Sequence, residues 1–124
     1  YGFKVKEMVE QYFNGKILVI PGQEIDKGNL HVVILYSPGD LTFRFVGHPG
    51  YPKVEDFGSL IDDTIHGIEL HNPGHDDEMD EAAIRTAAKE HNLLLLQNSD
   101  AHFLSDIGKY YNEITIEELC ARAS

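Results

Sequence analysis

The sequence predicts an α/β fold with mainly parallel strands, within a single domain of 124 residues. Apolar residues at helical spacing predict an amphipathic helix over residues 3–13 and another over residues 79–91. Apolar or alternating runs too short for helices predict strands over residues 17–20, 30–36, 41–46, 67–70 and 93–96. Because helices alternate with such strands, the pattern favours parallel pairing.

Turns and caps separate these elements. Gly, Pro, Asn and Asp gather after the first helix and after the first three strands, at residues 14–15, 21–22, 37–40 and 47–52. Residues 54–64 predict a short helix, and residues 98–108 predict a polar loop. Thr115 and Glu118 have the spacing of a capping box, which predicts a last helix starting at this point.

Composition excludes several classes of protein. The formal net charge of −11 argues against binding to nucleic-acid backbones, which requires clustered Lys and Arg. Apolar runs such as Leu93–Leu96 are far shorter than the ~20 residues that span a bilayer. A single cysteine, Cys120, cannot form an internal disulfide, and the absence of a leader adds to the expectation of a cytoplasmic protein. Because the sequence opens inside a predicted helix without Met, we expect an N-terminally truncated fragment.

Polar side chains follow the predicted strands where each strand ends. Because the carboxyl ends of parallel strands meet at one edge of a sheet, we expect these side chains to converge there. His31, at the start of its own strand, joins them if that strand runs in the opposite sense. The strand-end residues are Glu24, His48, His71, Asn72, His75, Asn98, Asp100 and His102.

These residues are ligands suited to a divalent metal ion. Imidazole nitrogens and carboxylate oxygens bind Zn²⁺, Mn²⁺ and Fe²⁺. Asp100 and His102 are two residues apart, so an extended backbone would project both to one face. The metal interpretation is favoured for Glu24, His31, His48 and the Asp100–His102 pair.

The other histidines suit structural roles better. His66 and His91 lie near predicted helix ends, where histidine commonly caps carbonyl groups. His75 stands in a charged segment before a helix, which favours a solvated side chain over a ligand. For His71 the structural and functional interpretations are equally open.

Five segments in order resemble motifs of the PHP (polymerase and histidinol phosphatase) superfamily of metal-dependent phosphoesterases. They are residues 21–25 (Pro-Gly-Gln-Glu-Ile), 30–31 (Leu-His), 47–49 (Gly-His-Pro), 67–69 (Gly-Ile-Glu) with Asn72, and 99–102 (Ser-Asp-Ala-His) with residues 107–108 (Ile-Gly). By this resemblance Glu24 matches a metal-bridging glutamate, His31 the histidine after it, His48 the His-Pro histidine, and Asp100 with His102 the closing Asp-x-His pair.

The resemblance implies a distorted β/α barrel, here partial, with two or three Zn, Mn or Fe ions in a complete site. It implies hydrolysis of a small-molecule phosphoester by metal-activated water, with Asp100 and His102 catalytic and His71 and Asn72 touching substrate. The family's opening His-x-His and Thr-Asp-His motifs do not occur, and Asn98 replaces a glycine. The alternatives are a non-catalytic metal-binding or interaction module and, third, an amidohydrolase. A homodimer is expected to form at the sheet edge that truncation would expose.

Overall fold

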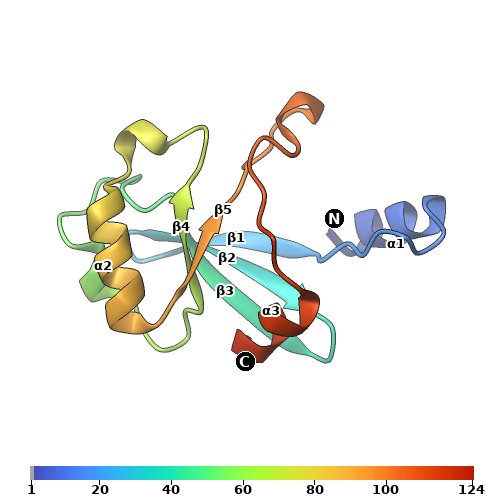
Figure 1. The fold of residues 1–124 in the computed structure, drawn as a ribbon, viewed down its shortest axis with the longest axis horizontal. Coiled ribbons are helices and arrows are strands. Elements are labelled where there is room, and N and C mark those ends of the chain that lie inside the picture. Colours follow the sequence, from blue (N-terminus) through green and yellow to red (C-terminus); the bar gives the residue numbers. More distant parts are fainter. Residues whose placement is uncertain (1) are drawn as a thin grey trace.

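The computed structural model describes residues 2–124, which form an open, mixed five-stranded sheet with strand order β1-β2-β3-β4-β5 (Figure 1). The strands are β1 (Gly22–Lys27), β2 (Leu30–Ser37), β3 (Leu41–Gly47), β4 (Gly67–His71) and β5 (Leu94–Gln97). The helices are α1 (Gly2–Tyr12), α2 (Glu81–His91) and α3 (Ile116–Arg122), with 3-10 helices η1 (Phe57–Leu60), η2 (Asp76–Glu78) and η3 (Leu104–Asp106).

The first three strands are antiparallel, which corrects the expectation of mainly parallel strands. β1 and β2 are joined by residues 28–29 alone, and β2 and β3 by residues 38–40. Gly28 and Gly39 adopt positive φ angles of 59° and 80° in these turns. A parallel pair needs a connection of about a dozen residues, so the much shorter links at residues 28–29 and 38–40 can form only hairpins.

Only β3, β4 and β5 pair in parallel, and the expected β/α barrel is wrong. The crossover from β4 to β5 contains α2, which begins at the N-cap Asp80 and ends at Asn92 in the left-handed conformation. A β/α barrel closes because about eight parallel strands are each followed by a helix. Here two hairpins replace such units, and among residues 2–124 β1 and β5 remain edges of the sheet.

Two predicted elements are misplaced. Residues 17–20 form no strand, and the first strand is instead the polar segment β1, whose six residues are all exposed. Charged residues are typical of a sheet edge that avoids pairing with other chains, so β1 lacks the apolar signal of a buried strand. The predicted helix over residues 54–64 shortens to η1, capped by the Asp56 side chain. The other predicted helices and strands are confirmed, including the capping box of Thr115 and Glu118.

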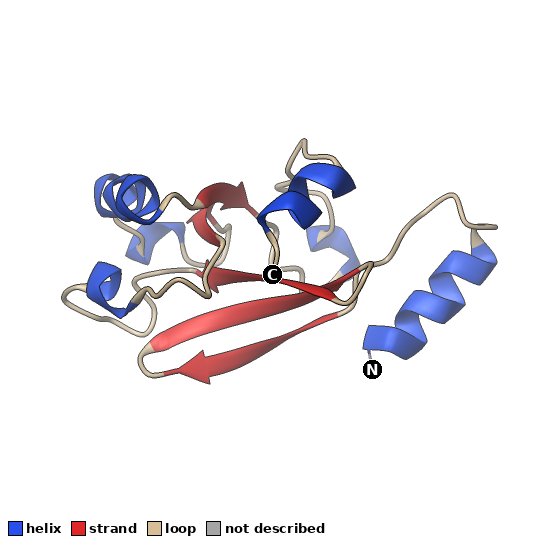
Figure 2. Ribbon diagram, turned by 90° about the horizontal axis from the view of Figure 1, so that it is seen from below, coloured by secondary structure: helices blue, strands red, loops and turns tan. Residues whose placement is uncertain are grey.

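Each face of the sheet packs against a different set of helices. α2 and η1 cover one face, and α3 covers the other (Figure 1). Alternate residues of one strand divide between the faces: Val46 packs beneath α2, whereas Phe43 and Phe45 pack on the α3 side. Figure 2 shows the twist that separates the β1–β2 hairpin from β4 and β5.

α1 extends from one end of the sheet and buries none of its residues (Figure 1). Its Phe3 ring lies 5.7 Å from the ring of Tyr36, and Lys6 Nζ donates to the Val19 carbonyl oxygen. No helix among residues 2–124 combines the length and the apolar composition that crossing a bilayer requires.

An ion pair ties the tip of the first hairpin to the segment before β4, and it predicts a small acid-sensitive contribution to stability. Lys27 Nζ lies 2.6 Å from Asp62 Oδ2. Hydrogen bonds from Lys27 and then from Thr64 lower the pKa of Asp62 from 3.8 to about 2. Because the folded-state pKa is the lower one, this stabilisation is present above 3.8 and is lost as the pH falls towards 2.

We expect Asp62→Asn to lower the midpoint of urea unfolding slightly at neutral pH and to flatten its acid dependence between pH 3.8 and about 2. The effect is small because the pair is exposed. Asp63→Asn, at the adjacent exposed carboxylate, is the matched control and should leave the urea midpoint at neutral pH unchanged. Equal acid dependence in wild type and Asp62→Asn would refute this contribution.

Candidate metal centre

The register of the first hairpin brings Glu24 and His31 to the same face of the sheet. Asp26 pairs directly with His31, and Glu24 lies two residues along β1, so all three side chains share one face. His31 Nδ1 is 3.0 Å from Glu24 Oε1, and His31 Nε2 is 3.1 Å from Asp26 Oδ1. Glu24 therefore reaches the site from within a strand, whereas the sequence predicted it after one.

His48 follows β3 directly and stands beside this pair. Gly47, the last residue of β3, is the register partner of His31 on β2. The His48 backbone has a φ of 28°, which is uncommon for a residue with a Cβ. Its N–H donates to Glu69 Oε2 at 2.6 Å, and its Nδ1 lies 2.9 Å from the Tyr51 carbonyl oxygen. Donation from Nδ1 to that carbonyl leaves the lone pair of His48 on Nε2.

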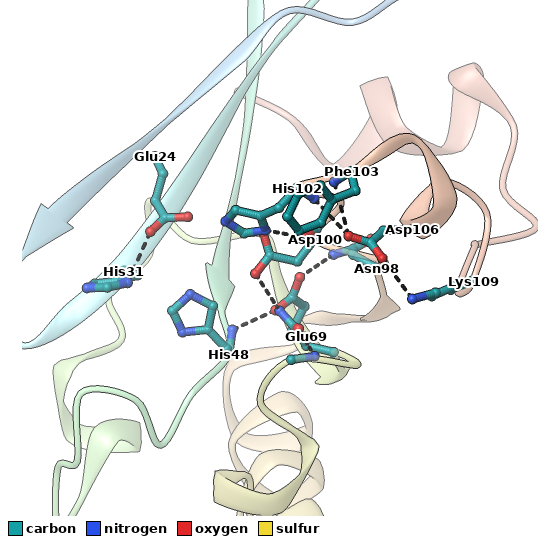
Figure 3. A network of polar contacts seen from close by, with 12 residues as sticks. Glu24, His31, His48, Glu69, Asn98, Asp100, His102, Phe103, Asp106 and Lys109 are labelled. Carbon is teal, nitrogen blue, oxygen red and sulfur yellow. Dashed lines mark hydrogen bonds and ion pairs between the residues drawn. The ribbon is translucent and has the colours of Figure 1, made fainter.

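Asp100 enters from the loop that follows β5. It also has a positive φ, of 46°, and its Oδ2 accepts from Asn72 Nδ2 at 3.2 Å. Figure 3 shows Glu24 and His31 on one side of His48 and Asp100 with Glu69 on the other. Positive φ angles at two such residues are a form of backbone strain that clusters at functional sites.

A buried carboxylate, Glu69 on β4, holds these loops together. Its Oε2 accepts from the His48 backbone and from Asn72 Nδ2, and its Oε1 accepts from Asn98 Nδ2 at 2.8 Å. Asn72 thus joins Glu69 to Asp100, and both Glu69 and Asn72 are almost fully buried. Sequence reasoning missed Glu69 as a site residue, although an acidic residue inside an otherwise buried strand signals such a role.

Two groups of side chains have ligand atoms close enough to hold a metal ion. Within each group the ligand atoms lie within 4.8 Å of one another; the groups are Glu24, His31, His48 and His48, His75, Asp100. Glu24, His48, Glu69 and Asp100 also line a cleft of about 300 Å³ on this face of the sheet. The structure thus brings together four predicted ligands, from β1, β2 and the loops after β3 and β5.

The arrangement fits a divalent ion with nitrogen and oxygen ligands. His31 Nδ1 is buried and makes no hydrogen bond, although Glu24 Oε1 lies only 3.0 Å away. Protonated His31 forms an ion pair with Glu24, whereas with a lone pair on Nδ1 this nitrogen and the carboxylate oxygen both face a position suited to a cation. A divalent cation satisfies both atoms, and imidazole with carboxylate is the ligand chemistry of Zn²⁺, Mn²⁺ and Fe²⁺.

His102 belongs to neither group. Its side chain is 75% exposed, and its Nδ1 lies 2.8 Å from the Asp100 carbonyl oxygen. The expectation that Asp100 and His102 project together assumed extended backbone, but the positive φ of Asp100 turns the chain between them. The catalytic role predicted for His102 stays a prediction.

His71 and Asn72, the predicted substrate-binding residues, lie close to this network. His71 Nδ1 is 3.7 Å from Asp76 Oδ1, and the Asn72 side-chain oxygen accepts from the Gly74 N–H. Tyr110 Oη donates to Asp76 Oδ2, and this hydrogen bond raises the pKa of Tyr110. Asn72 is occupied in orienting Asp100 and Glu69, and its contact with substrate stays a prediction.

The remaining histidines divide into one that joins the site and two that do not. His75, expected to be solvated, belongs to the second metal group. His66 lies away from the cleft: its Nδ1 accepts from the Arg44 backbone N–H, and burial, together with the Arg44 charge, lowers its pKa. His91 is the exposed last residue of α2.

Comparison with known proteins gives one relationship. A family model described as PHP-associated matches residues 80–123, which include α2, β5, Asp100 and α3. No curated protein and no solved structure matches the chain. The match covers Asp100 and His102, whereas Glu24, His31 and His48 precede it. Over residues 80–123, about a third of its length, the chain is similar to this PHP-associated family.

Proposed function

We propose that this chain binds a divalent metal ion at Glu24, His31, His48 and Asp100 and serves in metal-dependent hydrolysis of a phosphate ester. The observation that carries the proposal is that these side chains, from separate strands and loops, gather around His48, with Glu24, His48 and Asp100 lining a cleft of about 300 Å³. The relationship to the PHP superfamily supports the phosphoester as the substrate class.

The ligands favour one bound ion per chain. Both metal groups contain His48, whose Nδ1 is engaged by Tyr51. The single remaining imidazole nitrogen can coordinate only one ion, so the two groups share it. The two or three ions of a complete family site would therefore need ligands beyond these groups. Zn²⁺, Mn²⁺ and Fe²⁺ remain the candidates.

The residues around the cleft orient the ligands before anything binds. Tyr51 fixes the His48 ring, Asn72 holds Asp100, and Glu69 anchors the His48 backbone. A divalent ion held there supplies positive charge that polarises a phosphoryl oxygen and lowers the pKa of water. Such charge is essential, because this chain is strongly acidic and its own carboxylates would repel a phosphate.

In this proposal Asp100 binds the ion, His102 acts beside it, and His71 with Asn72 faces a small-molecule phosphoester. His102 is a candidate for this role because its ring is exposed and lies against Asp100, with Nδ1 2.8 Å from the Asp100 carbonyl oxygen. The cytoplasmic location and the homodimer stay predictions, and a monomer found by light scattering would exclude the latter.

Hydrolysis of a chromogenic aryl phosphate monoester tests the proposal directly. We expect the wild-type chain to release phosphate slowly in the presence of Mn²⁺ or Zn²⁺. Asp100→Ala should abolish this release, and a chelator should stop it. His91→Ala, at an exposed residue of α2, is the matched control and should keep wild-type rates. Metal-independent release, or release unaffected by Asp100→Ala, would contradict the proposal.

A non-catalytic metal-binding module is the second candidate. It is favoured by the open sheet and by a family match confined to residues 80–123, which excludes three of the four proposed ligands. Metal binding that depends on His48 and Asp100, without hydrolysis of any phosphomonoester or phosphodiester offered, would decide for this candidate.

A further inference from the structure

We propose that His75, held by Glu78, is a ligand of the divalent ion in this site, in the place that the sequence pattern assigned to His102. The inference deepens the proposed function and rests on its claim that the site binds a metal ion. It is carried by His75 belonging to a group of ligand atoms with His48 and Asp100, all within 4.8 Å of one another.

The two histidines differ in how the fold presents them. The His75 side chain is 22% exposed and that of His102 is 75% exposed. His75 precedes η2, and its backbone N–H donates to the Asn72 carbonyl oxygen, which ties it to the residue that orients Asp100. His75 is therefore already placed at the ion's position, whereas His102 would have to be drawn in from solvent.

Glu78 gives His75 the hydrogen-bonding state that a metal ligand needs. His75 Nδ1 lies 3.0 Å from Glu78 Oε1. Donation of the Nδ1 hydrogen to this carboxylate leaves the lone pair on Nε2, the arrangement of carboxylate–histidine–metal triads. His48 has the same arrangement, with the Tyr51 carbonyl oxygen as its acceptor.

Ring contacts restrict His75 further. Its ring stacks on Tyr51 with the centroids 5.0 Å apart and an angle of 23° between the planes. The His75 ring also contacts the His48 ring, with the two centroids 4.2 Å apart. A histidine that only forms a surface ion pair with glutamate needs neither contact, whereas a ligand benefits because its ring is ordered before the ion binds.

A third imidazole ligand, that of His75, also determines which divalent ions the site prefers. With His31, His48 and His75 the site offers three nitrogen ligands beside the carboxylates of Glu24 and Asp100. Imidazole-rich sets suit Zn²⁺ and Fe²⁺, whereas Mg²⁺ and Ca²⁺ prefer oxygen alone. We therefore expect this chain to bind Zn²⁺ far more tightly than Mg²⁺, and His75→Ala to narrow that difference.

Calorimetric titration of the chain with Zn²⁺, together with the visible absorption spectrum of the Co²⁺-loaded chain, tests the inference without any activity assay. We expect Glu78→Gln to weaken Zn²⁺ binding roughly 10–100-fold, the effect typical of losing a carboxylate that orients a ligand. We expect His75→Ala to weaken it at least as much and to change the Co²⁺ spectrum, because a nitrogen ligand is lost. The matched control His91→Ala should bind Zn²⁺ as the wild type does, and His102→Ala should lose far less affinity than His75→Ala.

The outcomes separate this inference from the proposed function. Wild-type binding of Zn²⁺ with no loss in His75→Ala, while His48→Ala binds none, would overturn the role of His75 and leave the metal site standing. A loss in His102→Ala as large as that in His75→Ala would equally overturn it. No Zn²⁺ binding by the wild type would refute both. Unchanged thermal unfolding of His75→Ala and Glu78→Gln would show that these variants fold.

Discussion

Replacing Glu69 with alanine is expected to lower the free energy of unfolding by about 2–4 kcal/mol, because one buried and one half-buried donor lose the acceptor that they have among residues 2–124. These donors are the His48 backbone N–H and Asn98 Nδ2, whereas Asn72 Nδ2 keeps Asp100 as a partner. The same change should weaken Zn²⁺ binding, because the positive φ of His48 is then no longer held by its hydrogen bond. Urea unfolding measures the first effect, and calorimetric titration of the folded protein measures the second.

Two further variants give this prediction its controls. Glu69→Gln keeps one acceptor oxygen and the volume of the side chain, so it should have an intermediate effect on both measurements. Glu55→Ala removes an exposed glutamate and should change the unfolding free energy by no more than about 0.5 kcal/mol. If Glu69→Ala destabilises the protein but its folded form binds Zn²⁺ as the wild type does, Glu69 supports the fold without positioning His48.

His48→Ala is expected to abolish metal binding more completely than any other single change. His48 belongs to both metal groups, so its loss leaves only the Glu24–His31 pair and the His75–Asp100 pair. We expect a loss of Zn²⁺ affinity greater than the roughly 10–100-fold effect of removing an orienting partner. Asp100→Ala and Glu24→Ala each remove a ligand from one group and should have smaller effects.

A structural explanation of any loss in His48→Ala needs to be excluded. The ring is buried, and its removal also ends the contacts with Tyr51 and His75. His48→Gln retains much of the side-chain volume but not the imidazole, so it should lose Zn²⁺ binding with less change in thermal stability. Tight Zn²⁺ binding by both variants would place the ion elsewhere.

The helices and four of the five strands could be predicted because their signals are local. Apolar periodicity, the cap at Thr115 and the turn residues at 37–40 depend on neighbouring positions alone. The pairing direction could also have been read from the chain, since the two links after β1 and β2 are too short for parallel crossovers. β1 escaped prediction because its residues are polar and exposed, as those of an edge strand are.

The ligand set was predictable in part for a different reason. Glu24, His31, His48 and Asp100 were singled out by their residue types and positions, and the fold brings them together. In the sequence His75 and His102 are both loop histidines, so their difference in side-chain exposure could not be predicted. Exposure depends on backbone angles such as the φ of 46° at Asp100. Glu69 and Glu78 act through other residues, and such contacts arise only once strands and loops are placed in space.

The central claim is that this chain by itself forms a divalent metal site centred on His48. Elemental analysis of protein purified without chelators or a polyhistidine tag, loaded with Zn²⁺ and then dialysed, tests it most directly. We predict one equivalent of Zn²⁺ per wild-type chain and none in His48→Ala. No retained Zn²⁺ in the wild type, or the same amount in both proteins, would contradict the account.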